Sequence, residues 1–323
     1  MKIVQWISCA SALAAAGVAP QAAAQGQWPN KPIRMTVSSG AGGGLDFVAR
    51  LIATPLTEAL GQSVVVDNRA GASGSIAAEV TAHSAADGYT FMMLSASLVV
   101  YGIVARTPYD LYRDFDAVSQ VAGGPYILTA HPSLPVKSVA DLVAYAKANP
   151  GKLNFASTGN ASLAHLAGEL FGQTTGTRVT HIPYKGVGAA LTDLLSGQVQ
   201  FSFLSGGSIY SQVRAGKLRA LAIASDKRAK VAPDMPTMIE AGVPGYTVTQ
   251  WHGMVAPRGT PRAIIDRVHR EIARGVQRPD VAARLDQDGT DAVGSTPQAF
   301  AAFLRAERDR WTQVIKNANI RIN

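Results

Sequence analysis

The chain has 323 residues, of which 47% are hydrophobic and 16% charged, and its formal net charge is +8. This composition excludes a disordered or fibrous protein, and the length allows roughly two domains of about 150 residues each. The positive charge either favours anionic ligands or only keeps the surface solvated, and no basic patch interleaved with aromatic residues indicates nucleic-acid binding.

Residues 1–24 are typical of a signal peptide. Lys2 is the only charged residue in this segment, an apolar stretch follows it, and the small residues up to Ala24 fit a cleavage site. An ordinary N-terminal helix and, through Cys9, a lipoprotein anchor are the alternatives. Cleavage near Ala24 would remove the only cysteine of the sequence, which excludes disulfides and thiolate chemistry. Because no other stretch is long and apolar enough to span a membrane, we expect the mature chain in the periplasm.

From residue 33 onward, short β-rich stretches alternate with helical patterns. This alternation predicts an α/β protein with mostly parallel sheets that helices cover on both faces. The predicted strands are residues 33–38, 63–68, 89–94, 126–131, 153–158, 179–184, 199–205 and 218–225, and the predicted helices include 45–60, 138–148, 162–175 and 187–196.

After the segment MVAPRGTP the alternation stops, and two long helices are predicted. Thr260 and Thr296 each precede a proline, so each is expected to be an N-cap with proline at the first helical position. Apolar residues recur at helical spacing in both segments. They are Ile264, Ile265, Val268 and Ile272 in the first helix, and Phe300, Phe303, Leu304, Trp311 and Ile315 in the second.

The segments that follow the predicted strands are rich in glycine and small hydroxyl residues. In open α/β sheets, ligands lie beyond the carboxyl ends of the strands. Glycine lets main-chain N–H groups approach a ligand, and a helix N-terminus adds unpaired donors, so such loops bind carboxylates without an arginine. The alternative is that each glycine serves only a turn. The segments are SSGAGGGLD (38–46), NRAGASGS (68–75), LSASL (94–98), ASTGNASLAH (156–165), PYKGVGA (183–189) and LSGGS (204–208).

The sequence lacks the motifs of the common enzyme classes. A Rossmann pattern that starts at Gly40 requires glycine where Leu45 stands, and the segment GASGS ends in Ser75 where a nucleophile elbow requires glycine. No P-loop motif occurs, and the six histidines show no metal-ligand spacing. We therefore expect no cofactor, no metal and no catalytic residues. His165 is either a packing residue or a functional one.

Eight segments carry a resemblance to a known family: WPNKPIRMTVSSGAGGGLDFVAR, VVVDNRAGASGSIAAE, ADGYTFMML, NPGKLNFASTGNASLAHLAGELF, THIPYKGVGAALTDLLSGQVQ, GKLRALAIAS, PDMPTMIEAGVPGY and WHGMVAPRGTP. In this order and spacing they resemble the substrate-binding proteins of tripartite tricarboxylate transporters, the Bug receptors. The similarity extends from about Trp28 to the C-terminus. It implies the type II periplasmic-binding-protein fold, a Venus flytrap of two α/β domains joined by two crossover strands. One lobe would hold residues 26–126 and 248–323, and the other would hold residues 127–247.

The resemblance also implies where a ligand binds. The family holds a ligand carboxylate between the loop after its first strand, here Gly40–Asp46, and the loop at Ser157–Ser162, partly through water. The main-chain groups so nominated belong to Ala41, Gly42, Gly43 and Gly44 on one lobe and to Thr158, Gly159, Asn160, Ala161 and Ser162 on the other. Ser73, Ser95, Lys185, Gly186 and Ser205 lie on neighbouring loops and are added to the predicted site.

Asp46 has two possible roles, to accept from a ligand amino group or to hold the loop as an acid at a helix N-terminus, and we favour the second. The chain also departs from the family at Ser38 and Ser39, where the family has proline and a bulky apolar residue, and at Asn160-Ala161, where it often has glycine and serine. With Ser39 leaving space or adding a hydroxyl, we expect a ligand larger or more polar than the small dicarboxylates of the family.

Together these features predict a periplasmic solute-binding receptor rather than an enzyme. The lobes would close on a carboxylate, and the closed monomer would present it to the permease subunits of a membrane transporter. One alternative is a sensory receptor that presents its ligand to a kinase ectodomain. The other is a periplasmic hydrolase or isomerase that uses Asp46, His165 or Lys185.

Overall fold

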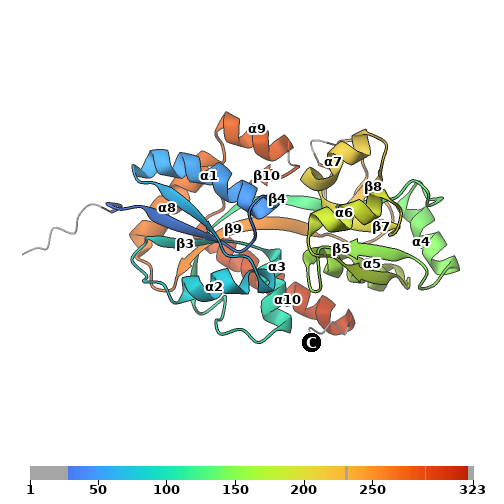
Figure 1. The fold of residues 1–323 in the computed structure, drawn as a ribbon, viewed down its shortest axis with the longest axis horizontal. Coiled ribbons are helices and arrows are strands. Elements are labelled where there is room, and N and C mark those ends of the chain that lie inside the picture. Colours follow the sequence, from blue (N-terminus) through green and yellow to red (C-terminus); the bar gives the residue numbers. More distant parts are fainter. Residues whose placement is uncertain (1–27, 230–231, 288, 319–323) are drawn as a thin grey trace, which may run out of the picture.

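The structure is a computed structural model, and it describes residues 28–229, 232–287 and 289–318, so that the predicted signal peptide lies outside the described residues. The strands form one mixed sheet in the order β2-β1-β3-β9-β4-β7-β5-β6, with β8 and β10 also paired to β4. Figure 1 shows two groups of elements side by side, with β4 and β9 running between them. Helices lie against both faces of the strands in each group.

The first group, called the first half, contains both the N-terminal and the C-terminal elements. Its strand β1 (Ile33–Val37) pairs in parallel with β2 (Val64–Asn68) and β3 (Thr90–Ser95). Its helices are α1 (Gly44–Leu60), the 3-10 helix η1 (Ala72–Gly74), α2 (Ser75–Ala82), α3 (Ala96–Val104), α8 (Arg262–Gly275), α9 (Pro279–Gln287) and α10 (Pro297–Ala318), and β10 (Asp291–Ala292) is a short strand beside them.

The second group, called the second half, contains the middle of the chain. Its strand β5 (Asn154–Ser157) pairs in parallel with β6 (Thr180–Pro183) and β7 (Phe201–Ser205). Strand β8 (Arg219–Ile223) and the helices α4 (Val139–Ala148), α5 (Leu163–Thr175), α6 (Val187–Leu195) and α7 (Gly206–Arg214) complete it.

Two long antiparallel strands join the halves. Strand β4 (Phe115–Ala130) pairs with β9 (Thr249–Pro257) from Phe115 to Pro125, and with β7 and β8 from about Tyr126 onward. One strand therefore belongs to both halves and changes its partners at residues 125–126. The predicted lobe boundaries, 126/127 and 247/248, stay a prediction.

The sheet is mixed, so the expectation of mostly parallel strands is wrong. The strands that join the halves run in opposite directions, and β4 is antiparallel to β7, β8, β9 and β10. Neither β9 nor residues 115–125 of β4 were predicted, because FDAVSQVAGG and TQWHG mix glycine and polar residues into the apolar pattern, which lowers their strand propensity. The helices α1, α4, α5 and α6 match the predicted ranges to within one residue at each end.

The predicted N-cap role is confirmed for Thr296 and is wrong for Thr260. The N–H of Ala299 donates to the Thr296 hydroxyl at 3.2 Å, so Thr296 caps α10 as predicted. At α8 the prediction is wrong, since Pro261 occupies the N-cap and the Thr260 hydroxyl donates to the Pro257 carbonyl at 2.7 Å instead. This bond draws the threonine side chain back toward the strand end and away from the first turn of the helix.

Helix α10 contributes much of the core between the halves. Its predicted stripe is confirmed, since Phe300, Leu304, Trp311 and Ile315 are buried and Phe303 packs against them. The helix contacts β4 and α3 and also α5 in the second half. Within this layer the buried carboxylate of Glu307 accepts from the indole N–H groups of Trp251 and Trp311, at 2.9 and 3.0 Å. These bonds satisfy polar groups that burial would otherwise penalise.

We expect Gly253→Ala to destabilise the protein, because Gly253 of β9 lies directly beneath Phe300 of α10. A Cβ atom at this position would stand 2.1 Å from Phe300 Cζ. Over-packing of this kind costs about 1–3 kcal/mol of the free energy of unfolding, measured by urea denaturation. Gly102→Ala is the control, since it lies in α3 with no atom within 4 Å of a built Cβ. Equal unfolding midpoints for the two variants would contradict the prediction.

Candidate functional site

A cleft of about 320 Å³ lies where the two halves meet. Strands β4 and β9 form its floor, while α1 and the turn after α9 line it from the first half and α6, β7 and α7 line it from the second. No aspartate, glutamate, lysine or arginine is among the described residues that line it. The lining residues are Gly42, Gly43, Gly44, Phe47, Gly124, Pro125, Tyr126, Val187, Leu204, Ser205, Gly207, Ser208, Gln250, His252, Gly289 and Thr290.

The first wall is the N-terminus of α1. Gly43 is the N-cap, in an extended conformation, and no side chain caps the helix. The loop before it is held by Asp46, whose side chain is 5% exposed and whose carboxylate accepts from Gly42 N at 2.8 Å and Asn68 Nδ2 at 2.9 Å. Arg50 Nε donates to the same carboxylate at 3.0 Å. These are the contacts of a residue that holds the loop.

Burial raises the pKa of Asp46, but the hydrogen bonds from Arg50, Gly42 and Asn68 outweigh this effect and keep the pKa below its ordinary value of 3.8. Asp46 is therefore a carboxylate at neutral pH. Its charge is matched by Arg50 and lies beneath the loop, outside the lining of the cleft.

The opposite wall is formed by the N-termini of α6 and α7. Ser205 is the N-cap of α7, but its hydroxyl lies 2.9 Å from the Ser208 hydroxyl and does not cap the helix. Gly186 is the N-cap of α6 and likewise offers no side-chain cap, and Val187 after it lines the cleft. Uncapped first turns present free N–H donors and the positive end of the helix dipole. The cleft therefore favours an anion although no charged side chain lines it.

The loop at Ser157–Ser162 uses much of its hydrogen-bonding capacity internally. Gly159 N donates to Ser157 Oγ at 3.1 Å, and Ala161 N donates to His165 Nδ1 at 3.1 Å. Ser162 N donates to Gly159 O at 3.2 Å, and the Ser162 hydroxyl caps α5 by accepting from His165 N. None of the five predicted residues 158–162 lines the cleft. Of the predicted site, the cleft brings together Gly42, Gly43, Gly44 and Ser205.

The remaining predicted residues do not line the cleft. Ser38 is buried against Gly74. The Ser39 hydroxyl donates to the main-chain carbonyl of the next residue, Gly40, at 3.4 Å. The structure therefore gives these serines no direct contact with the cleft. Of the other residues, Ala41 is exposed, Ser73 has a φ of 52° in η1, Ser95 is the last residue of β3 and the N-cap of α3, and Lys185 and Gly186 precede α6.

Two polar residues of the floor were missed from the sequence. Gln250 Nε2 donates to His252 Nε2 at 3.0 Å, and a Cβ built on Gly44 would lie 3.8 Å from the same amide nitrogen. His252 is 3% exposed, and burial lowers its pKa to about 4, so it is neutral at neutral pH. Their spacing in the sequence could have identified them. Residues two apart on a strand share one face of the sheet, and Trp251 between them is buried on the opposite face.

Two stacked histidines support the loop at Ser157–Ser162 from below. The rings of His165 and His181 are 3.7 Å apart and nearly parallel, and His181 Nε2 is 2.6 Å from Ser157 Oγ. Burial, together with the neighbouring His165, lowers the pKa of His181 to about 3. His165 is therefore a packing residue that also holds the loop, because its Nδ1 accepts the hydrogen bond from the Ala161 N–H.

We expect stability to fall as the pH is lowered from about 6.5 to 4. His181 and His252 stay neutral in the fold but bind protons in the unfolded chain, since their pKa values are lowered from 6.5 to about 3 and about 4. Each then removes up to about 1.4 kcal/mol of the free energy of unfolding per pH unit. Urea unfolding at several pH values measures this slope. His181→Gln should reduce it, and a slope unchanged in that variant and in His252→Gln would contradict the assignment.

Two α/β halves that share crossing strands and enclose a cleft define the class of the protein, which is a solute-binding receptor with the periplasmic-binding-protein fold. The chain matches the model of the tripartite tricarboxylate transporter family receptor over residues 48–320, and it belongs to this family. None of the helices in the described ranges has the length and apolar character needed to cross a membrane.

Relatives and solved structures agree with this assignment. Protein BugT of Bordetella pertussis is 38% identical over 313 residues, which are 96% of each chain. The structure of R. palustris Rpa4515 with adipate has a TM-score of 0.84 and 37% identity, and it covers 91% of this chain and 99% of its own. MatC (Rpa3494) from Rhodopseudomonas palustris with bound malate has a TM-score of 0.79 and 31% identity, with coverage of 89% and 100%. The resemblance to the Bug receptors is thereby confirmed.

Proposed function

We propose that this protein captures a small organic acid in the periplasm and delivers it to a membrane transporter of the tripartite tricarboxylate type. The observation that carries this proposal is the cleft, which has no charged side chain among its described lining residues and faces the uncapped N-termini of α1, α6 and α7. Such a site binds a carboxylate through main-chain N–H groups. The similar structures with adipate and malate support a carboxylate as the ligand.

In the proposed mechanism, Gly43 and Gly44 bind the carboxylate from one side and Ser205 and Ser208 from the other. Rotation about the crossing strands, with lobe boundaries at 126/127 and 247/248, would then bring the loop at Thr158–Ser162 to the ligand, with the main-chain N–H groups of Thr158 and Asn160 as its donors. These contacts coexist only in the closed state, so binding shifts the protein toward closure. Phe47 and Tyr126 give the cleft an apolar part that suits the carbon chain of the acid.

A ligand screen tests the proposal. Adipate, malate, succinate, aromatic acids and amino acids are added to the purified protein, and the unfolding temperature is measured. A true ligand at 100 times its dissociation constant adds about 2.7 kcal/mol to the free energy of unfolding. Small-angle scattering with that ligand should show a smaller radius of gyration. If no organic acid stabilises the protein, the proposal fails.

Recovery of the ligand separates a receptor from an enzyme. We expect the bound acid to be released chemically unchanged after prolonged incubation, since Ser205 lies beside Ser208 rather than beside a base and His252 is buried with its Nε2 paired to Gln250. Chromatography of the released acid measures this. Formation of a product would favour a hydrolase or isomerase.

A further inference from the structure

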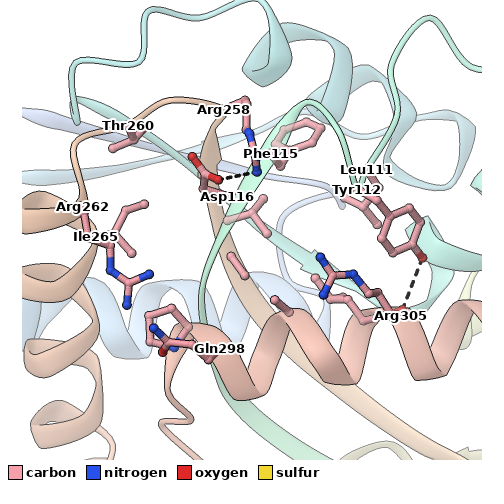
Figure 2. A pocket seen from close by; sticks show the side chains of 15 residues that line it. Leu111, Tyr112, Phe115, Asp116, Arg258, Thr260, Arg262, Ile265, Gln298 and Arg305 are labelled. Carbon is pink, nitrogen blue, oxygen red and sulfur yellow. Dashed lines mark hydrogen bonds and ion pairs between the residues drawn. The ribbon is translucent and has the colours of Figure 1, made fainter.

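A second cavity lies in the first half and shares no lining residue with the cleft. It has a volume of about 370 Å³ and is bordered by β4, β9, α8 and α10, as Figure 2 shows. We call it the arginine pocket after Arg258, Arg262 and Arg305, which are among its lining residues. Its volume lies within the range of small-molecule sites.

The arginine pocket has an apolar part beside its charged and polar lining residues. Phe115, Val255, Ile265 and Leu304 are buried and line it, and Ala301 lies between Leu304 and the first turn of α10. Residues 297, 301, 304 and 305 of α10 line it together because they share one face of the helix. A ligand with an apolar body would remove this surface from water.

The residues that line the arginine pocket carry more positive than negative charge. Asp116 is the only carboxylate among the described lining residues, and it is paired with Arg258 at 2.8 Å. Arg262 pairs with Asp266, which lies outside the pocket, at 2.9 Å. Arg305 forms no ion pair within the described part of the chain, and Figure 2 shows it on the α10 side, opposite Arg262. One guanidinium beside an apolar cavity is therefore available to an anion.

We propose that the arginine pocket is a second binding site, which takes an organic acid with an apolar body and holds its carboxylate at Arg305. The apolar body lies against Phe115, Ile265 and Leu304. Because the pocket is built entirely from the first half and its crossing strands, its occupant binds whether or not the cleft is closed. The proposal is independent of the ligand of the cleft.

Matched probes test both parts of this chemistry by isothermal titration calorimetry. Cyclohexanecarboxylate carries the ring and the charge, cyclohexanemethanol only the ring, and acetate only the charge. We expect the first to bind with one site in the arginine pocket and the other two to bind at least about tenfold more weakly. No saturable binding of cyclohexanecarboxylate up to about 10 mM would overturn the proposal and leave the pocket to a larger acidic partner.

Variants assign that binding to the pocket. Arg305→Gln should weaken it about tenfold, Arg305→Lys should weaken it less, and Ala301→Trp should abolish it by filling the cavity. None of these changes touches a residue that lines the cleft, so any binding there persists. Arg270→Gln removes the same charge from an exposed position on α8 and serves as the control. Unfolding midpoints show that each variant is folded. Equal affinities for the wild type, Arg305→Gln and Ala301→Trp would overturn the proposal.

Discussion

Gly43→Asp is expected to abolish binding of the cleft ligand while the protein stays folded. The new carboxylate would occupy the N-terminus of α1, where we propose that the ligand carboxylate binds, so it would both fill the site and repel the ligand. We expect the dissociation constant to rise at least about 100-fold, since a blocked anion site and like-charge repulsion together exceed about 2.7 kcal/mol. Calorimetry with the best acid from the screen measures it.

The fold tolerates this change for a specific reason. Gly43 has a φ of −83°, which any residue adopts, and the nearest atom to a built Cβ is Gly40 O at 3.6 Å. Aspartate is also a favourable N-cap residue, so the free energy of unfolding should stay the same or rise. Gly43→Asn is the matched control, because it has the same shape and capping ability without the charge, and it should retain more of the affinity. If Gly43→Asp binds the acid as the wild type does, this loop is not part of the site.

Asp46→Asn is expected to weaken both the fold and the binding of the cleft ligand. Both carboxylate oxygens accept hydrogen bonds, from Gly42, Arg50 and Asn68, and an asparagine would turn an NH₂ group toward these donors. A buried donor left without its acceptor costs about 1–3 kcal/mol. Release of the loop should raise the dissociation constant at least about tenfold. Urea unfolding and calorimetry measure the two effects.

Asp67→Asn is the control for this second prediction. Asp67 on β2 is a more exposed carboxylate that accepts from Arg34 and Arg69, and its ion pairs do not involve the loop at residues 38–44. We expect this variant to lose stability without a change in affinity. If Asp46→Asn loses stability and keeps full affinity, Asp46 contributes to folding alone and the loop keeps its shape without it.

Local patterns were sufficient for most helices and strands and for the family. The strands β1, β3 and β7 and the helices α1 and α5 each show a local pattern of apolar residues, which depends only on neighbours in the chain. The crossing strand β9 was missed because its pattern depends on a partner far away in sequence. In the sequence, Gln250 and His252 only interrupt the apolar pattern with polar side chains. In the structure, β4 pairs beside them, and the two halves enclose the face of β9 that carries them.

For the binding site too, some features were predictable from the sequence and others depended on the tertiary structure. The sequence by itself determined that glycine-rich turns precede the helices, because glycine at Gly43 and Gly186 is a local property of the chain. It also predicted that such turns bind a carboxylate through main-chain groups without an arginine, which stays a prediction. Only the tertiary structure decided which turns line the cleft, because Gly42–Gly44 meet Ser205–Ser208 across β4 and β9, whereas Ser157–Ser162 satisfies many of its donors through His165 and its own residues. A donor is available to a ligand only if no neighbour in the fold has taken it.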